Sequence, residues 1–201
     1  MKIRWEIIFS GLTAFGTLAI AALAIWGDWI RTRLFRGELS LEMYEGSVSL
    51  ANQPPHQIYY YHLKVVNKRW WRRADNCRVL LKAMSRRGPN GVFQSIAMPV
   101  PLQFIWAPQN VTPSAIAIQH EEILDFGLVR EGNPRFEPRL YWIPNHFTGF
   151  VGANEAIRYS LQIVSDAYVS KTYRVFEVAF DGVWNPVLAE MTTHLTIDEI
   201  A

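Results

Sequence analysis

An uncharged apolar run opens the chain. No residue from Ile7 to Ile25 is charged, and this run is nineteen residues long. As a helix it measures about 28 Å, close to the hydrocarbon thickness of a bilayer. The pattern predicts a transmembrane helix at about residues 7–26, within an N-terminal segment 1–37. The apolar part of a secretory signal peptide is shorter, so we expect this segment to be retained as an anchor.

From residue 38 onward, apolar and polar residues alternate with a period of two, which is typical of strands with one buried face. The clearest case is Ile157–Ile163, and Arg174–Phe180 is its predicted antiparallel partner. Gly88–Gly91 contains Asn-Gly, which tolerates the positive φ of a tight hairpin turn. Further strands are expected at Leu39–Met43, Tyr61–Val65, Val79–Ala83 and Thr192–Ile197. We therefore predict a single β domain over residues 38–201.

Residues 99–155 do not follow this alternation. Seven prolines interrupt the stretch, and proline in a sheet is confined to edges and bulges. We expect short strands and long loops there. Across the whole domain, many strands, frequent turns and the lack of a long amphipathic helix predict two packed antiparallel sheets. The expected fold class is mainly β, an antiparallel β-sandwich preceded by one N-terminal transmembrane α-helix.

Two neighbouring segments resemble a known domain family. Lys64-Val65-Val66-Asn67, a loop, and then Ala74-Asp75-Asn76-Cys77-Arg78-Val79 are similar to a signature of immunoglobulin-like bacterial adhesion-type domains. In that family one strand ends in Val-x-Asn and the next begins Ala-x-Asn-Val-x-Val. A glycine usually follows the first asparagine, whereas this chain continues with Lys68-Arg69-Trp70. The resemblance implies an immunoglobulin-like sandwich, which mostly serves as a scaffold or binding module, and implies no activity.

Charge is unevenly distributed along the chain. Residues 1–37 carry a net charge of +3, residues 64–87 carry +8 and residues 88–201 carry −6, although the whole chain carries only +2. The basic residues are therefore concentrated at the N-terminal segment and in one strand–loop–strand unit, unlike those of a uniformly basic protein. The single cysteine, Cys77, excludes an internal disulfide and fits a reducing compartment.

The segment Lys68–Arg73, here called the basic loop, reads Lys-Arg-Trp-Trp-Arg-Arg. Its cations attract phosphate, and its indoles either stack on bases or lie among lipid headgroups. Beside a membrane anchor, anionic headgroups are the nearest phosphates. The alternatives are nucleic acid or another anionic ligand, or a solvated loop whose tryptophans cap the sandwich and whose cations pair with acidic residues. The predicted binding residues are Lys64, Lys68, Arg69, Trp70, Trp71, Arg72, Arg73, Arg78 and Lys82.

Aromatic and basic residues flank the apolar run, as expected at a membrane interface. The positive-inside rule favours a single-pass protein with a cytoplasmic C-terminal domain, because three arginines follow the run. The predicted interface residues are Trp5, Trp26, Trp29, Arg31, Arg33 and Arg36. A seam of small residues is also present, on which two such helices can associate into a homo-oligomer. The seam consists of Ser10, Ala14, Thr17, Ala21 and Ala24.

No catalytic or metal-binding motif is recognisable. The histidines include no i,i+4 pair and none lies beside a cysteine, so we predict no metal site and no cofactor. Asp125-Phe126-Gly127 repeats the letters of a kinase motif without its glycine-rich or His-Arg-Asp loops. Cys77 has no neighbour in the sequence that activates a nucleophile. We expect a non-catalytic binding or assembly module near the bilayer, with membrane lipid and a protein as partners.

An enzyme is the alternative, with a site assembled from residues that are distant in the sequence. It requires a pocket lined by titratable groups, for which His120, Asp125 and His146 are the candidates. A third expectation is a partner protein bound at a sheet edge or at the proline-rich central loops.

Overall fold

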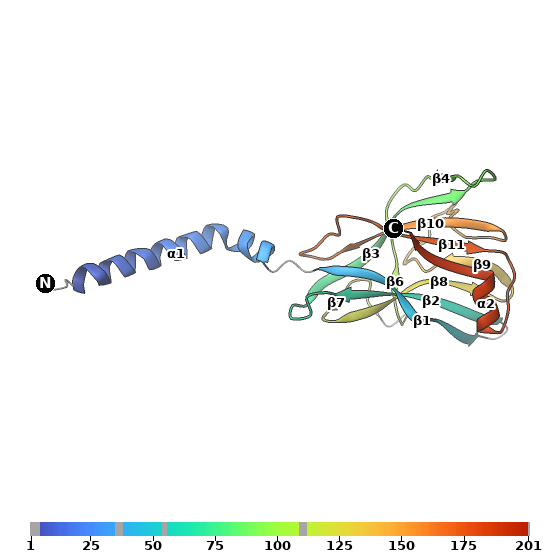
Figure 1. Cartoon of the computed structure of the whole chain (residues 1–201), viewed down its shortest axis with the longest axis horizontal. Helices are drawn as coiled ribbons and strands as arrows, with labels where there is room; N and C mark the ends of the chain where they lie inside the picture. Colours follow the sequence, from blue (N-terminus) through green and yellow to red (C-terminus); the bar gives the residue numbers. More distant parts are fainter. Residues whose placement is uncertain (1–4, 35–37, 54–55, 109–111, 201) are drawn as a thin grey trace. The chain divides into compact units, whose positions relative to one another are not determined.

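The computed structural model describes residues 5–34, 38–53, 56–108 and 112–200. Within these ranges it describes all side chains except those of residues 5–8, 10, 28–34, 45–50, 52, 53 and 56. The chain divides into two compact units, Met1–Arg36 and Gly37–Ala201. The described part of the first unit is a helix, and the second unit consists mainly of β-strands (Figure 1).

The helix of the first unit is α1, Trp5–Leu34. It contains no proline, so every residue can take part in an uninterrupted helix. The hydroxyls of Thr13 and Thr17 donate hydrogen bonds to the carbonyls four residues earlier, which satisfies these polar groups within the helix. Large apolar side chains are exposed around more than half of its circumference. They are 57–73% exposed and comprise Phe9, Leu12, Phe15, Leu18, Ile20, Leu23, Ile25 and Trp26.

No helix in the part of the chain that the structure describes combines the length and the apolar character needed to cross a membrane. The transmembrane helix therefore stays a prediction from the sequence, as does the seam of small residues. Among the predicted interface residues, the side chain of Trp26 is described and is 57% exposed. The interface residues outside the described side chains are Trp5, Trp29, Arg31, Arg33 and Arg36.

The second unit contains two antiparallel sheets that pack as a sandwich (Figure 1). The first sheet has the strand order β1-β2-β8-β6, and β9 pairs with a further stretch of β8. Its strands are β1 (Leu39–Gln53), β2 (His56–Asn67), β6 (Ile105–Trp106), β8 (Glu121–Arg130) and β9 (Asn133–Pro138).

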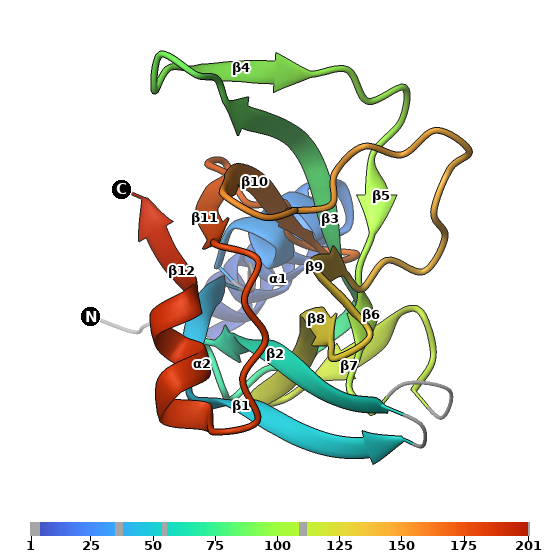
Figure 2. The same ribbon diagram turned by 90° about the vertical axis from the view of Figure 1, so that its right-hand side faces the viewer.

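The second sheet has the order β12-β11-β10-β3-β4, and β5 and β7 also pair with β3. The fourteen-residue strand β3 organises it, with β10 on one side and β7, β5 and β4 in succession along the other. Figure 2 shows β3 curving away from the centre of the sandwich toward β4. The strands are β3 (Ala74–Arg87), β4 (Phe93–Ile96), β5 (Leu102–Gln103), β7 (Ile116–Ile118), β10 (Glu155–Val164), β11 (Arg174–Phe180) and β12 (Leu195–Ile200).

Period-two alternation predicted the strands that have one exposed face. β10 and β11 pair antiparallel, as expected, with Ile157 opposite Val178. The inward positions of β10 are all buried, at Ile157, Tyr159, Leu161 and Ile163. The Asn-Gly turn joins β3 to β4, and Gly91 has a φ of +79°, a conformation that glycine adopts without steric cost. The mainly β, antiparallel sandwich predicted from the sequence is therefore present.

The stretch expected to contain only short strands holds the ten-residue strand β8, in the middle of the first sheet. The expectation was wrong because β8 carries a bulge. Tyr61 pairs with Gly127 and His62 with Asp125, which leaves Phe126 as an extra residue. The bulge turns Phe126 and Gly127 both toward the core and shifts the alternation by one position. Residues 124–129 are all buried, so exposed residues no longer alternate with buried ones in this part of β8.

The last strand also begins later than predicted. Residues 192–194 belong to the short helix α2, Leu188–His194, which lies beside β12 (Figure 2). Asn185 Oδ1 accepts a hydrogen bond from the backbone N–H of Val187, just before the helix. Met191 is fully buried four residues before the buried Leu195. The end of a short helix, in which Met191 is the buried residue, therefore occupies the first three positions of the expected strand.

Aromatic rings fill the middle of the sandwich. Phe126 is fully buried, and its ring centroid lies 5.5–5.8 Å from those of Phe104, Phe136, Tyr159 and Phe176. Because these rings come from both sheets, the cluster links the two layers. The hydroxyl of Tyr159 donates a hydrogen bond to the carbonyl of Gly149 at 2.7 Å, and burial raises the pKa of this tyrosine well above its usual value.

Strand directions decide which loops share an end of the sandwich. Leu39 pairs with Asn67, so β1 begins at the end where β2 stops and the basic loop leads into β3. Val164 pairs with Arg78, so the segment 165–173, here called the second loop, lies at this end too. We call it the β1 end, and it carries both loops.

Candidate functional site

One buried side chain holds the basic loop in place. Asn67 is 3% exposed, and its Oδ1 accepts a hydrogen bond from the backbone N–H of Arg69 at 3.0 Å. Its Nδ2 donates to the carbonyls of Arg72 at 2.6 Å, Ile118 at 3.2 Å and Gln119 at 3.3 Å. The asparagine thus ties both ends of the loop to the connection between β7 and β8.

Three cations of the basic loop have carboxylate partners. The pairs are Lys68–Glu42, Arg69–Glu38 at 3.9 Å and Arg73–Asp75 at 2.8 Å. The hydrogen bond from Lys68 lowers the pKa of Glu42. All three pairs are largely open to solvent, so each contributes at most about 1 kcal/mol and weakens in salt. The alternative of cations paired with acidic residues is therefore observed for these three.

The two tryptophans point into solvent, and the alternative in which they cap the sandwich is wrong. Trp70 is 60% exposed and Trp71 is 62% exposed. Their ring centroids lie 6.2 Å apart in an edge-to-face arrangement, and Trp70 stacks on His120 at 6.3 Å. Gln119 Nε2 donates a hydrogen bond to the carbonyl of Trp70. Two large indoles exposed side by side on a fixed backbone are unusual on a surface that meets only water.

The structure does not gather all of the predicted flanking cations beside the loop. Lys64 is on the outer face of the first sheet, with its Nζ 3.2 Å from Glu121. Arg78 and Lys82 are on the outer face of the second sheet. Lys82 lies eight residues beyond the start of β3, roughly 26 Å along the strand. Lys64 and Arg78 thus flank the β1 end on opposite faces, whereas Lys82 lies away from it.

The second loop carries side chains similar to those of the basic loop, and sequence reasoning missed it. Val169 is 47% exposed and Tyr173 is 50% exposed. Lys171, between them, is also exposed. Asn76 Nδ2 donates a hydrogen bond to Asp166 Oδ2 at 2.7 Å, which fixes this loop to the start of β3 across ninety residues of sequence. Only the strand pairing reveals that the two loops are neighbours.

A cavity of about 300 Å³ lies between the two loops and the start of β1. Both loops contribute to its lining. Its apolar lining consists of the buried side chains of Leu39, Leu41, Leu161 and Ile163 and the half-buried ring of Tyr168. Its polar lining combines two cations, a carboxylate and three aliphatic hydroxyls, from Lys68, Arg174, Glu38, Ser40, Ser170 and Thr172. The cavity therefore offers cationic and hydroxyl donors beside an apolar surface.

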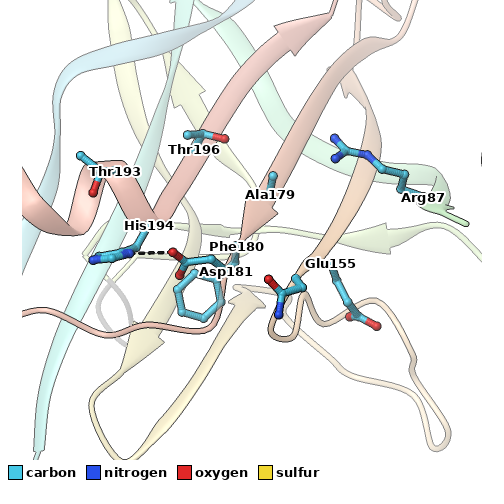
Figure 3. Close-up of a pocket in the computed structure, with 9 residues that line it drawn as sticks. Arg87, Glu155, Ala179, Phe180, Asp181, Thr193, His194 and Thr196 are labelled. Atoms are coloured by element: carbon cyan, nitrogen blue, oxygen red, sulfur yellow. Dashed lines mark hydrogen bonds and ion pairs between the residues drawn. The ribbon is translucent and has the colours of Figure 1, made fainter. Parts of the chain in front are cut away.

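A second cavity, of about 340 Å³, lies at the opposite end of the sandwich (Figure 3). Figure 3 shows His194 turned toward Asp181, with Nδ1 and Oδ2 2.7 Å apart. Asp181 Oδ1 also accepts a hydrogen bond from the backbone N–H of Val183 at 2.8 Å. Desolvation opposes ionisation, but the bonds from His194 and Val183 outweigh it and lower the pKa of Asp181. The pair joins the end of β11 to the start of β12, which is a structural role.

The residues suggested for an enzyme site lie apart. His120 stacks on Trp70 at the β1 end. Asp125 is 4% exposed and lies 2.9 Å from His62 Nδ1 on the outer face of the first sheet. His146 is exposed between β9 and β10, and none of the three lines either cavity described above. Within the described ranges, no group of three His, Cys, Asp or Glu residues is arranged to hold a metal ion.

Cys77 is fully buried near the start of β3. Burial raises the pKa of its thiol to about 11, so the reactive thiolate is scarce at neutral pH. Its Sγ also lies in hydrogen-bond contact with the carbonyl of Ala74, at 3.3 Å. The thiol is therefore neither activated nor accessible to a reagent added to the folded protein.

Comparison with known proteins gives little further information. No protein-family model matches the chain, and no curated protein matches it. Among solved structures the chain is similar to one described as the X-ray structure of Northeast Structural Genomics Consortium target SoR45. The identity is 12% and the TM-score 0.22, over 76% of this chain and 91% of that chain. A similarity at this level supports no inference about function.

Proposed function

We propose that this chain is a membrane-anchored, non-catalytic module whose β1 end contacts the anionic headgroups of the bilayer that holds it. The observation that carries the proposal is the exposure of Trp70 and Trp71, at 60% and 62%, in a loop with four cations. Indoles favour the headgroup layer, and Lys and Arg side chains are attracted to anionic lipid. The second loop adds Val169, Lys171 and Tyr173 to the same end.

Helix α1 is the proposed anchor. The uncharged run Ile7–Ile25 is nineteen residues long, which corresponds to about 28 Å of helix. The large apolar side chains described in α1 are 57–73% exposed. So much exposed apolar surface is unfavourable in water. Single-pass insertion into a bilayer removes it from water and keeps every backbone hydrogen bond within the helix.

The length of the connecting chain supports contact between the β1 end and the same bilayer. Residues 35–37 separate Leu34, the last residue of α1, from Glu38. Four Cα–Cα steps therefore limit the distance between these two residues to about 15 Å. The carbonyl of Glu38 accepts a hydrogen bond from the backbone N–H of Lys68 at 2.8 Å, so the basic loop lies where the chain enters the sandwich. A bilayer that holds α1 is thus within reach of this loop.

The strand order favours an immunoglobulin-like sandwich. In that fold, strands A, B, E and D form one sheet, and C, F and G form the other. Strands β1, β2, β8 and β6 correspond in order to the first set, and β3, β10 and β11 to the second. On this assignment β12 extends the second sheet beyond strand G. Such domains serve as scaffolds and binding modules, which agrees with a non-catalytic role.

A fluorophore at position 71 tests the contact with lipid. Trp71→Cys in the full chain can be labelled selectively with an environment-sensitive dye, because Cys77 is buried. In nanodiscs of phosphatidylcholine with phosphatidylglycerol, we expect a blue-shifted emission that nitroxide lipids quench, and a weaker response without phosphatidylglycerol. Changing Arg69, Arg72 and Arg73 together to Glu should abolish the difference in dye emission between nanodiscs with and without phosphatidylglycerol. Six units of charge, at about 1 kcal/mol each near an anionic surface, are enough to undock the loop.

The matched control changes the same three arginines to lysine, which retains the charge. In this variant the emission of the dye at position 71 should equal that of the chain with the three arginines. A second control places the dye at Asn90→Cys, in an exposed turn at the opposite end of β3. Its emission should be that of a water-exposed dye in both kinds of nanodisc. The glutamate variant is expected to fold, because the ion pairs that Arg69 and Arg73 make with Glu38 and Asp75 are open to solvent and contribute little to stability. If it responds to anionic lipid as strongly as the lysine variant, the loop does not bind headgroups.

The same exposed turn reports on membrane orientation. Three arginines follow the apolar run, so the sandwich is expected to face the anionic cytoplasmic leaflet. In cells expressing Asn90→Cys, an impermeant maleimide should label the protein only after permeabilisation, and an alkaline carbonate wash should leave it in the membrane. Cys77 adds no background because it is buried. Labelling in intact cells would place the sandwich outside, and release by carbonate would exclude the anchor.

A further inference from the structure

We propose that the cavity between the basic loop and the second loop binds the phosphate-bearing headgroup of one anionic lipid molecule. The inference rests on the function proposed above and names its ligand. The cavity volume, about 300 Å³, is at the lower limit of small-molecule sites and sufficient for a glycerol phosphate group. Diffuse electrostatic attraction to a charged surface does not depend on the structure of the lipid headgroup. A cavity of this size holds one headgroup, so its affinity depends on the shape and hydrogen-bonding groups of that headgroup.

Two cations from separate elements line the cavity. Lys68 belongs to the basic loop, and Arg174 is the first residue of β11. Each pairs with a carboxylate that does not line the cavity, Lys68 with Glu42 and Arg174 with Glu199 at 2.6 Å. An ammonium has three N–H donors and a guanidinium has five, so both cations keep donors for a phosphate. Their acidic partners orient them without occupying the cavity.

Hydroxyl groups extend this set of donors. Ser170 and Thr172 line the same cavity, whereas Ser40 Oγ, also in the lining, donates its proton to Glu42 Oε1 at 2.7 Å. Ser170 Oγ accepts a hydrogen bond from the backbone N–H of Ile163 at 3.2 Å, which leaves its own proton for a ligand oxygen. With Glu38 as the carboxylate of the lining, the formal net charge is +1. Cations beside hydroxyls match the phosphate and glycerol oxygens of a lipid headgroup.

The apolar part of the lining favours a lipid over a free phosphate ion. Leu39 and Leu41 come from β1, and Leu161 and Ile163 come from β10, so both sheets contribute. These four side chains are at most 4% exposed, and the half-buried ring of Tyr168 adds the more accessible apolar surface. An inorganic anion gains nothing from such a ring, whereas the glycerol carbons and first methylenes of a lipid can pack against it. The cavity shares the β1 end with Trp70 and Trp71, whose indoles are proposed to lie in the headgroup layer.

Calorimetric titration of the full chain, in a neutral detergent, with dihexanoyl phosphatidate tests the site. We expect saturable binding of one lipid per chain. Lys68→Gln should weaken it about fivefold through the loss of one charge beside the phosphate. Lys82→Gln, which removes the same charge from the outer face of β3 away from the cavity, is the matched control and should have no effect. Thr172→Trp places an indole in the cavity from an exposed position and should abolish binding.

Two soluble ligands distinguish the source of the phosphate. Competition by glycerol phosphate supports recognition of the headgroup itself. Inorganic phosphate bound as tightly as the lipid, or unchanged binding by Thr172→Trp, would overturn the proposal. If the titration fails while the dye at position 71 still responds to anionic nanodiscs, the cavity is not a headgroup site and the function proposed above stands. If both responses are missing, that function is excluded as well.

Discussion

Replacing Phe126 with alanine is expected to lower the free energy of unfolding of the sandwich by about 3–5 kcal/mol, the usual cost of truncating a buried phenylalanine. Phe126 is fully buried, and its ring packs against rings from both sheets at centroid distances of 5.5–5.8 Å. The strand cannot close in to fill the gap, because the Phe136 ring covers the adjacent Gly127. A Cβ at Gly127 would lie 2.1 Å from that ring. Urea unfolding of the full chain in mild detergent, followed by tryptophan fluorescence, measures the loss.

Trp142→Ala is the matched control for this substitution. It removes a larger aromatic side chain that is 59% exposed, so the free energy of unfolding should change by no more than about 0.5 kcal/mol. Since a domain of this kind is stable by about 5–15 kcal/mol, Phe126→Ala should remove a large part of the total. A loss below about 1 kcal/mol would contradict the central position of Phe126 in the core.

Asn67→Ala is expected to cost about 2–4 kcal/mol and to loosen the basic loop. The change deletes the hydrogen bond from Arg69 N–H and leaves the carbonyls of Arg72, Ile118 and Gln119 without the Nδ2 donor. Unpaired buried polar groups are costly because water cannot replace the lost partner. Hydrogen exchange of the backbone amides of residues 69–73 should accelerate together with the loss of stability. The dye at position 71 should then respond more weakly to anionic lipid.

The control for Asn67→Ala is Asn133→Ala. Asn133 is exposed, and its side chain makes a 3.4 Å hydrogen bond to Glu137, so its removal should change stability by no more than about 0.5 kcal/mol. It should also leave hydrogen exchange in residues 69–73 unchanged. Equal exchange in both variants would mean that other contacts hold the basic loop.

Sequence pattern predicted the strands that have one polar and one buried face. In β10 the side chains alternate regularly because its neighbours β3 and β11 leave its outer face open to solvent. In β8 the same reasoning failed, because the bulge at Phe126 shifts the phase and residues 124–129 are all buried. A bulge is a mismatch between two paired strands, so the sequence of one strand alone does not reveal it.

Part of the candidate site was recognisable because its residues are consecutive. The basic loop, Lys68–Arg73, stands out as six residues without interruption, and its flanking strands were predicted from their alternation. The second loop and the cavity were not predicted. The residues that line the cavity come from β1, the basic loop, β10, the second loop and β11, up to more than one hundred positions apart in the chain. No local pattern links such residues, because only strand pairing brings them together.

By itself the sequence determined that this protein is mainly β with antiparallel sheets, and it identified the basic loop and the uncharged run Ile7–Ile25. Only the tertiary structure decided that Trp70 and Trp71 are exposed, that Cys77 is buried and that two loops enclose a cavity. The physical reason is the range of the interactions. Periodicity and composition describe residues that are neighbours along the chain, whereas burial and cavities depend on the register and partners of strands from distant segments.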